Sequence, residues 1–202
     1  MQQIPLTTFS VSTALPGPAL SPYRHRLKRL LDVTVLLLTG PLVLPFVLLL
    51  ARPAWLSGGQ PFYGHMRIGR DGRRFTCWKL RTMARDADAV LEAHLAAEPT
   101  AAEEWRRYRK LARDPRITRF GRLLRRASLD ELPQLLNVLR GEMSLVGPRP
   151  LTEAELSEYG AARHAYLHVT PGITGLWQVS GRNELTMTQR AAFDMQYVQE
   201  LS

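Results

Sequence analysis

The chain has a single cysteine, Cys77, among its 202 residues. One thiol excludes an intramolecular disulfide and a cysteine-rich metal site as supports of the fold. His164 and His168 lie four residues apart, but the adjacent glutamate that a zinc-protease helix requires is missing. The sequence also has no internal repeat and no strand–helix–strand alternation, so a repeat array and a doubly wound sheet are both excluded.

Acidic residues are too few to balance the basic ones. There are 27 Lys and Arg against 18 Asp and Glu, which gives a net charge of +9. The excess lies in residues 60–126, with 17 basic against 8 acidic side chains. Such a surface favours an anionic partner. A nucleic-acid-binding protein would account for the charge and would show strongly salt-dependent binding, but not for the apolar run and acidic pair described below. No nucleic-acid partner is therefore predicted.

Two segments are nearly free of charge. Residues 1–22 contain no charged side chain and are rich in Pro, Ser and Thr, which predicts a disordered tail. From Leu30 to Ala51 the only charged residue is Asp32. These 22 residues reach the length of about 20 that a membrane-spanning helix needs.

Three structures fit this apolar segment: a buried core helix, a straight membrane span and a re-entrant membrane helix. Gly40-Pro41 and Pro45 interrupt it, and each proline removes a helical hydrogen bond. Both flanks are basic, with Arg24, Arg26, Lys28 and Arg29 before it and Arg52 after it. Because basic flanks prefer the cytoplasm, we expect a re-entrant helix broken at Gly40 and Pro41. The other two structures remain alternatives.

The remaining patterns predict an α+β fold that is mostly helical. Tyr63–Ile68 and Arg74–Leu80 alternate around an Arg-Asp-Gly turn, which predicts a β-hairpin. A helix interrupted at Pro99 is expected in residues 85–114. Residues 114–126 should form a turn followed by a short basic helix. Further helices are expected over 129–140, 152–165 and 186–200, and a loop over 171–184. The expected domains are the tail 1–22, a membrane re-entrant helix 23–57 and a cytoplasmic catalytic domain 58–202.

An acidic pair, Asp130 and Glu131, stands at the start of the apolar helical stretch "SLDELPQLLNVL". Helix capping is one explanation, with Ser128 as the N-cap and Glu131 at N3. Pro133 would then lie inside the helix, whereas Asp130 as the cap would put Pro133 at N3, where no N–H is needed. Capping thus explains one carboxylate more easily than two, and catalysis is the alternative.

Arginines directly upstream favour the catalytic explanation. They recur at three- and four-residue spacing, so several could share a helix face: Arg116, Arg119, Arg122, Arg125 and Arg126. A solvated helix face or a patch for anionic lipid headgroups would also use such residues. However, a carboxylate that attacks a phosphoryl group must approach an anion, and guanidinium groups that bind phosphate relieve that repulsion. The two elements together indicate a phosphate-bearing substrate.

Four motifs in order resemble the bacterial sugar transferases, monotopic phosphoglycosyl transferases that begin exopolysaccharide assembly. They are "KRLLDVTVLLLTGPLVLP", "KLRTM", "DPRITRFGRLLRRASLDELPQLLNVLRGEMSLVGPRP" and "PGITGLWQVSGRN". The resemblance covers about residues 24–202. It implies a monotopic membrane protein with an N-terminal re-entrant helix at the cytoplasmic face of the bacterial inner membrane. The segment around residues 91–116 most resembles members that load galactose 1-phosphate.

The resemblance also implies the reaction and its partners. A UDP-sugar, UDP-galactose or UDP-glucose, would give its phosphosugar to an aspartate and release UMP. Polyprenyl (undecaprenyl) phosphate would then take up the phosphosugar as a diphosphosugar, with Mg²⁺ as the cofactor. Membrane lipids are further expected partners, and a homodimer is an assembly to be tested. Such chemistry is nearly energy-neutral, so the enzyme mainly positions groups and neutralises charge.

Matched to this sequence, the family motifs assign roles to particular residues. The nucleophile would be Asp130, which would also be the metal ligand, with Glu131 as its partner. Substrate or phosphate would be bound by the basic residues of the motifs, namely Arg125, Arg149, Lys79, Arg81 and Arg182. The membrane break would lie at Gly40 and Pro41, where members often have Ser-Pro. Members also carry a further membrane-associated stretch past the position of Ser202, and a catalytically impaired scaffold is therefore an alternative function.

Overall fold

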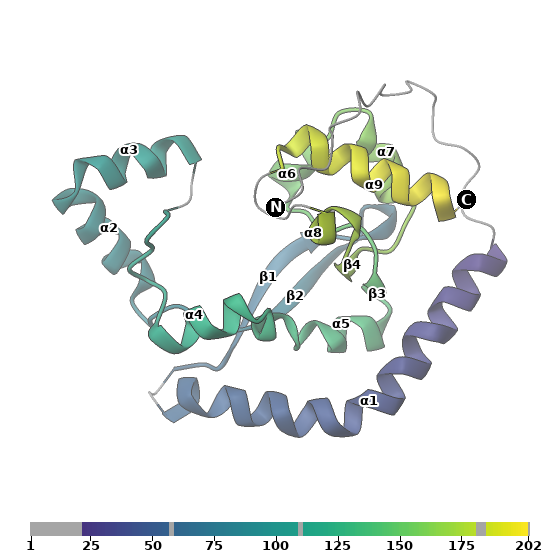
Figure 1. The fold of residues 1–202 in the computed structure, drawn as a ribbon, viewed down its shortest axis with the longest axis horizontal. Coiled ribbons are helices and arrows are strands. Elements are labelled where there is room, and N and C mark those ends of the chain that lie inside the picture. The colour runs from purple at the N-terminus through teal and green to yellow at the C-terminus, as the bar shows by residue number, and fades with distance from the viewer. Residues whose placement is uncertain (1–21, 57–58, 109–110, 181–184, 202) are drawn as a thin grey trace, which may run out of the picture. The chain divides into compact units, whose positions relative to one another are not determined.

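The computed structural model describes residues 22–56, 59–108, 111–180 and 185–201 (Figure 1). The predicted disordered tail falls outside these residues except for Pro22. The chain divides into two compact units. Unit 1 comprises Met1–Leu36, Met66–Cys77 and Asn137–Ser202, and unit 2 comprises Leu37–His65 and Trp78–Leu136.

The apolar segment forms one long helix, α1 (Pro22–Leu56), with prolines at 41, 45 and 53 inside it. It is long and apolar enough to cross a membrane, and only 11% of its apolar window is buried. Leu38 and Leu42 are 75% and 79% exposed. A core helix of a soluble protein would bury such side chains, so α1 is compatible with membrane association. The helix continues through Gly40 and Pro41, and a re-entrant path remains a prediction.

The predicted β-hairpin is confirmed. Strand β1 (Phe62–Ile68) pairs with β2 (Arg74–Leu80) in a two-stranded sheet. A short 3-10 turn, η1 (Arg70–Gly72), joins them. Asp71 and Gly72 have φ values of 57° and 75°, and the Asp-Gly pair suits a turn that needs two left-handed residues.

Four further helices occur where the sequence predicts helical structure. Pro99 separates α2 (Ala87–Ala97) from α3 (Pro99–Tyr108). It takes the first position of α3, where a missing N–H costs no helical bond. The short basic helix is α4 (Arg119–Arg126). Near the C-terminus, α9 (Met187–Leu201) fills most of the expected helix over 186–200.

Two predicted helices are each divided in the structure. The expected helix 129–140 consists of a 3-10 turn, η2 (Leu129–Glu131), and α5 (Gln134–Arg140). Pro133 lies between them because its ring and missing N–H do not fit a helix interior. The expected helix 152–165 consists of α6 (Glu153–Ser157) and α7 (Ala162–Leu167). Gly160, with φ of 53°, ends the first piece.

The expected loop over 171–184 contains regular structure that the sequence analysis missed. Strand β4 (Gly172–Thr174) pairs in parallel with β3 (Ser144–Val146), and α8 (Leu176–Ser180) follows. The glycines permit this pairing, because a Cβ on Gly172 would lie 2.1 Å from the backbone N of Gly147. Three-residue strands give too short a pattern to recognise in a sequence.

Each unit has its own apolar clusters. In unit 1, one cluster contains Ile68 of β1, Leu156 of α6, Tyr166 of α7 and Ala191 of α9, together with Tyr159 between α6 and α7. A second cluster in unit 1 contains Phe75, Cys77, Val138 and Met143. In unit 2, the later part of α1 contributes Val47 and Ala51, which pack with Leu80 and Leu124.

Candidate active site

The acidic pair lies on a turn held in place by apolar packing in unit 2. Leu129 and Leu132, on either side of the pair, pack against the cluster that contains Val47 and Ala51 of α1. Ser128 has a left-handed backbone, with φ of 56°, and its side chain makes no cap. The capping box with Ser128 as N-cap, one of the two explanations offered for the acidic pair, is therefore not formed. A non-glycine residue with positive φ is uncommon and costs free energy, so packing of the neighbouring leucines must hold this turn.

Asp130 is almost fully buried, with 8% of its surface exposed. Burial raises the pKa of its carboxyl group, because a charged carboxylate loses hydration. The charge of Lys79 opposes this rise, Glu131 adds to it, and Arg125 again lowers the pKa. The side chain is thus a poorly hydrated carboxyl group between cations, an environment typical of catalytic groups.

Glu131 is engaged by a cation from the hairpin. Lys79, near the end of β2, donates a hydrogen bond from Nζ to Oε1 of Glu131 at 2.7 Å. The two side chains are 21% and 15% exposed, so solvent screens this pair less than an exposed one. The hairpin and the η2 turn, about fifty residues apart in sequence, therefore meet at the acidic pair, and the roles of Lys79 and Glu131 in catalysis remain predictions.

Arg125 is oriented by Thr82, which follows β2. Its Nε donates a hydrogen bond to Oγ1 of the buried Thr82 at 2.8 Å. The backbone of Thr82 is itself fixed, because its carbonyl accepts from the backbone N of Thr118, the N-cap of α4, at 3.0 Å. The chains approach so closely that a Cβ on Gly121 would lie 2.1 Å from the Thr82 oxygen. Arg125 remains exposed, so its terminal nitrogens can reach a ligand.

Two other basic residues of unit 2 behave differently. Arg81 directly follows β2, and its Nε is buried with no hydrogen-bond partner in the described part of the chain. Arg116 lies before α4 rather than on its face. It binds Asp114 through Nε and Nη2, at 2.9 and 2.7 Å, and lies 4.9 Å from the ring of Trp105. Arg116 therefore supports local structure, while Arg119, Arg122, Arg125 and Arg126 are exposed.

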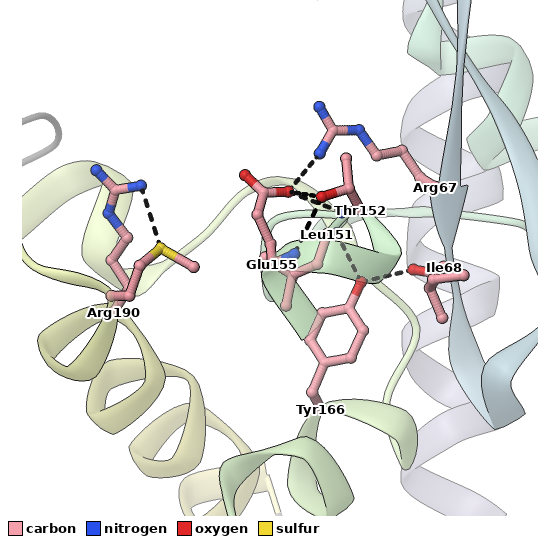
Figure 2. A network of polar contacts seen from close by, with 8 residues as sticks. Arg67, Ile68, Leu151, Thr152, Glu155, Tyr166 and Arg190 are labelled. Atoms are coloured by element: carbon pink, nitrogen blue, oxygen red, sulfur yellow. Dashed lines mark hydrogen bonds and ion pairs between the residues drawn. The ribbon is translucent and has the colours of Figure 1, made fainter. Parts of the chain in front are cut away.

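Arg149 belongs to unit 1. Figure 2 shows the contacts of Glu155, a residue of the same unit whose charge interacts with that of Arg149. Oε2 of Glu155 accepts hydrogen bonds from the backbone N of Thr152 at 2.7 Å and from Arg67 at 2.8 Å. Burial raises the pKa of Glu155, but bonds from Thr152 and the charges of Arg67 and Arg149 outweigh burial and lower it. The ionised Glu155 thus stabilises positive charge at Arg149.

Tyr166 fixes the segment that follows Arg149. Figure 2 shows its hydroxyl between Ile68, at the end of β1, and Leu151: it donates to the carbonyl of Ile68 at 2.6 Å and accepts from the backbone N of Leu151 at 3.0 Å. Ile68 and Leu151 also form an antiparallel bridge. These contacts anchor Leu151, the residue that directly follows the "GPRP" turn, and the rigidity of that turn remains a prediction. The position of Arg149 beside the acidic pair remains a prediction.

The other predicted site residues are placed as follows. Arg182 lies outside the described residues. Gly40 and Pro41 are inside α1. Within the described ranges, no group of three or more His, Cys, Asp or Glu side chains could hold a metal. Mg²⁺ is usually bound by one or two carboxylates together with substrate phosphates, and the Asp130–Glu131 pair fits that mode.

Sequence reasoning missed the residues that support the site. Thr82 lies within the quoted "KLRTM" motif, which was the available signal for its importance. Glu155 is three residues after Thr152 and forms a capping box with it, a pattern that the sequence shows. The link from Glu155 to Arg67 spans 88 residues, and no local pattern reports such a contact.

Comparison with known proteins agrees with these observations. The bacterial sugar transferase family model matches residues 23–202. The exopolysaccharide production protein ExoY of Rhizobium meliloti is 52% identical, over 91% of this chain and 82% of the relative. An undecaprenyl-phosphate galactose phosphotransferase of Salmonella typhimurium is 46% identical, over 85% of this chain and 36% of the relative. A UDP-glucose:undecaprenyl-phosphate glucose-1-phosphate transferase of Caulobacter vibrioides is 42% identical, over 87% of this chain and 63% of the relative.

The match to the family model covers nearly all of the described chain, and the ExoY relative is covered over most of its length. Both the quoted motifs and the acidic site lie within the matched residues. The chain therefore belongs to the bacterial sugar transferase family and is an enzyme of the sugar-phosphate transferase type.

Proposed function

We propose that the enzyme transfers hexose 1-phosphate from a UDP-hexose to polyprenyl phosphate through a covalent intermediate on Asp130. The observation that carries this proposal is the environment of Asp130: a buried carboxyl group next to Glu131, with Lys79 and Arg125 acting on its charge. Two relatives are named as transferases of galactose phosphate or glucose phosphate to undecaprenyl phosphate, and these names support the same reaction class.

In the first step, a carboxylate oxygen of Asp130 attacks the phosphorus that carries the sugar. An O–P bond forms to Asp130, the phosphoanhydride bond breaks, and UMP leaves with the electron pair. Low hydration makes the carboxylate a better nucleophile, and Lys79 and Arg125 favour its ionised form. Arg125 would stabilise the negative charge on the transferred group. Arg81, Arg149 and Arg182 are proposed to bind the donor's phosphates or nucleotide.

In the second step, an oxygen of polyprenyl phosphate attacks the phosphorus of the aspartyl phosphosugar. The new anhydride forms, and the carboxylate of Asp130 leaves. Packing of Leu129 and Leu132 on Val47 and Ala51 of α1 places the nucleophile next to the apolar helix. A lipid acceptor in the membrane can therefore reach a site that a water-soluble donor has already loaded.

Mg²⁺ is proposed as the cofactor, held by the carboxylates of Asp130 and Glu131 together with the donor's phosphates. When bound, the ion would offset negative charge on those phosphates. The donor sugar is proposed to be galactose or glucose, and the product would begin exopolysaccharide assembly. The name of the ExoY relative supports that pathway.

The covalent route has a direct test. Enzyme, Mg²⁺ and UDP-hexose without polyprenyl phosphate should release UMP up to one equivalent per active site, and the peptide with Asp130 should gain the mass of a phosphohexose. Added polyprenyl phosphate should remove that mass. A single-step transfer needs both substrates together, so absence of UMP and adduct, in a preparation that turns over normally with both substrates, would contradict the intermediate.

We also propose that α1 is re-entrant, with the catalytic part on the cytoplasmic face of the inner membrane. Single cysteines at positions 21 and 57 should then both resist a membrane-impermeant thiol reagent on intact cells. Cys77 is 1% exposed and should label little in the parent chain. Labelling at only one position would indicate a straight span. Pro41→Leu should increase the spanning population because it restores a helical hydrogen bond.

A further inference from the structure

The start of α1 forms one wall of a polar cavity in unit 1. The cavity has a volume of about 210 Å³. Its lining includes His25, Lys28, Arg29 and Asp32 from α1 and Thr170 and Tyr197 from elsewhere in unit 1. Drug-sized ligands occupy pockets of about 300 Å³ or more, so this cavity suits a smaller group.

The cationic side chains of the cavity are held in place by the protein. Lys28 donates from Nζ to Oγ of Ser144 at 2.5 Å. Arg29 donates to the carbonyls of Val138 and Leu139 at the end of α5, the second at 2.8 Å. Rigid donors bind an anion without losing further side-chain entropy. Lys28 also retains N–H groups beyond the one that Ser144 accepts.

The negative charge of Asp32 is already engaged. It is 6% exposed, and its two oxygens accept from Oγ of Ser144 at 2.6 Å and from the backbone N of Leu145 at 3.1 Å. Lys28 lies 4.0 Å from it. Lys28 and Arg29 carry two positive charges and Asp32 carries one negative charge. The cavity therefore has a net positive charge, which favours an anion.

Apolar side chains of α1 are exposed next to the cavity. Leu31 and Val35 are 58% and 44% exposed. Leu31 lies three residues after Lys28, which places the two on neighbouring positions of the helix surface. Lipid phosphates lie at the edge of the hydrocarbon layer, where an apolar helix surface gives way to basic residues. A ligand with a phosphate and an acyl chain would match both features.

We propose that this cavity binds the phosphate headgroup of an anionic phospholipid, with the acyl chains against the exposed Leu31 and Val35 of α1. The phosphate would receive hydrogen bonds from Lys28 and from the hydroxyl of Thr170. The site is separate in residues from the acidic pair, so it anchors the enzyme to the membrane rather than taking part in the reaction. It does not depend on the proposed transfer mechanism.

The test mixes the purified full chain in neutral detergent with short-chain phosphatidylglycerol. Native mass spectrometry then counts the lipid molecules bound to each chain. One phosphatidylglycerol per chain should be retained, in preference to phosphatidylcholine with the same chains. Lys28→Gln should weaken retention by at least about tenfold, because it removes a charge inside the site. Arg26→Gln is the matched control: it removes an equal charge from an exposed position on the same helix and should change retention about twofold at most.

A second variant keeps the proposal testable if Lys28→Gln unfolds. Thr170→Met fills the cavity without changing the charge and should also abolish preferential retention, at an unchanged unfolding midpoint. Equal effects of Lys28→Gln and Arg26→Gln, or full retention by Thr170→Met, would overturn the proposal in favour of diffuse attraction. Inorganic phosphate that binds as tightly as the lipid would show a soluble-anion site. Displacement by one equivalent of polyprenyl phosphate would reassign the cavity to the acceptor.

Discussion

Asp32 and Asp130 are both almost fully buried, at 6% and 8% exposure, but their surroundings differ. In unit 1, the two oxygens of Asp32 accept from a serine hydroxyl and a backbone N–H. In unit 2, Asp130 lies beside Glu131 and within the influence of the charges of Lys79 and Arg125. Donors at fixed positions make the buried carboxylate of Asp32 a structural connection, and Lys28 lies 4.0 Å from it. Two cations and a second carboxylate near Asp130 suit the group that we propose accepts a phosphoryl group.

The same contrast applies to other acidic residues of unit 1. Asp194 accepts from the hydroxyl of Tyr159 at 3.0 Å, and Glu155 caps α6. These carboxyl groups connect helices and strands within one core. Exchange of a carboxylate for an amide should therefore change stability in unit 1 and activity in unit 2, and the predictions below test that division.

The largest effect is expected for Asp130→Asn. Turnover should fall by about 1000-fold or more, equal to about 4 kcal/mol of transition-state stabilisation, because the amide keeps the size and loses the nucleophile. The unfolding midpoint should change little. Asp32→Asn is the matched control, with a lower midpoint and nearly normal turnover per folded molecule. If Asp130→Asn keeps more than about a tenth of the activity, the nucleophile is another group.

A large effect on stability is expected at Asp194. Burial raises its pKa to about 7, above the value of about 3.9 in an unfolded chain. Between these values the folded state binds more protons, so its contribution to stability is present at low pH and is lost as pH rises towards 7. Asp194→Asn removes this dependence, worth up to about 4 kcal/mol.

Thermal unfolding of parent and Asp194→Asn at pH 5 and pH 8 measures the difference. The variant should gain stability relative to the parent at the higher pH, because an amide can still accept from Tyr159. All other titrating groups are shared and cancel. If the unfolding midpoints of the two proteins changed equally between pH 5 and pH 8, Asp194 would already be ionised in the folded parent.

An intermediate effect is expected for Lys79→Met. Loss of the cation should lower kcat/KM for UDP-hexose by about 10- to 100-fold, or about 1.4 to 2.7 kcal/mol, and should raise the pKa of Asp130 further. The acid side of the pH–rate profile should therefore move to higher pH. In a double-mutant cycle, Glu131→Gln should add less in the Lys79→Met background than alone. Additive effects and an unmoved profile would show that the ion pair is only structural.

The smallest effect is expected for Thr82→Val. The substitution removes the Oγ1 acceptor that orients Arg125, while the protein keeps the guanidinium group itself. Turnover should fall by about threefold to tenfold, in line with one hydrogen bond of about 1 kcal/mol. Arg125→Ala should cost more, and Thr82→Val should add nothing to it. An equal loss from Thr82→Val in the parent and in Arg125→Ala would mean that Thr82 acts elsewhere.

Prediction from the sequence succeeded where a short stretch of chain contains its own reason for its structure. The hairpin follows from alternation around Asp71 and Gly72, and the division of α2 from α3 follows from Pro99. It failed where neighbours decide the backbone. Ser128 adopts a left-handed conformation because the leucines around it are packed, and its capping pattern gave the wrong structure. The parallel pair β3–β4 joins strands of three residues, too short for any period to appear.

The sequence by itself determined the family, the apolar helix and the identity of the acidic pair, because composition, length and motif order are local or additive properties. Only the tertiary structure decided which side chains the basic residues of the site contact. Lys79 reaches Glu131 across 52 residues, and Arg125 reaches Thr82 across 43. It also decided that Asp130 is buried beside α1 while Arg116 is bound by Asp114. Burial and charge pairing depend on residues that folding brings together, so the tertiary structure and not the local sequence sets the pKa of Asp130.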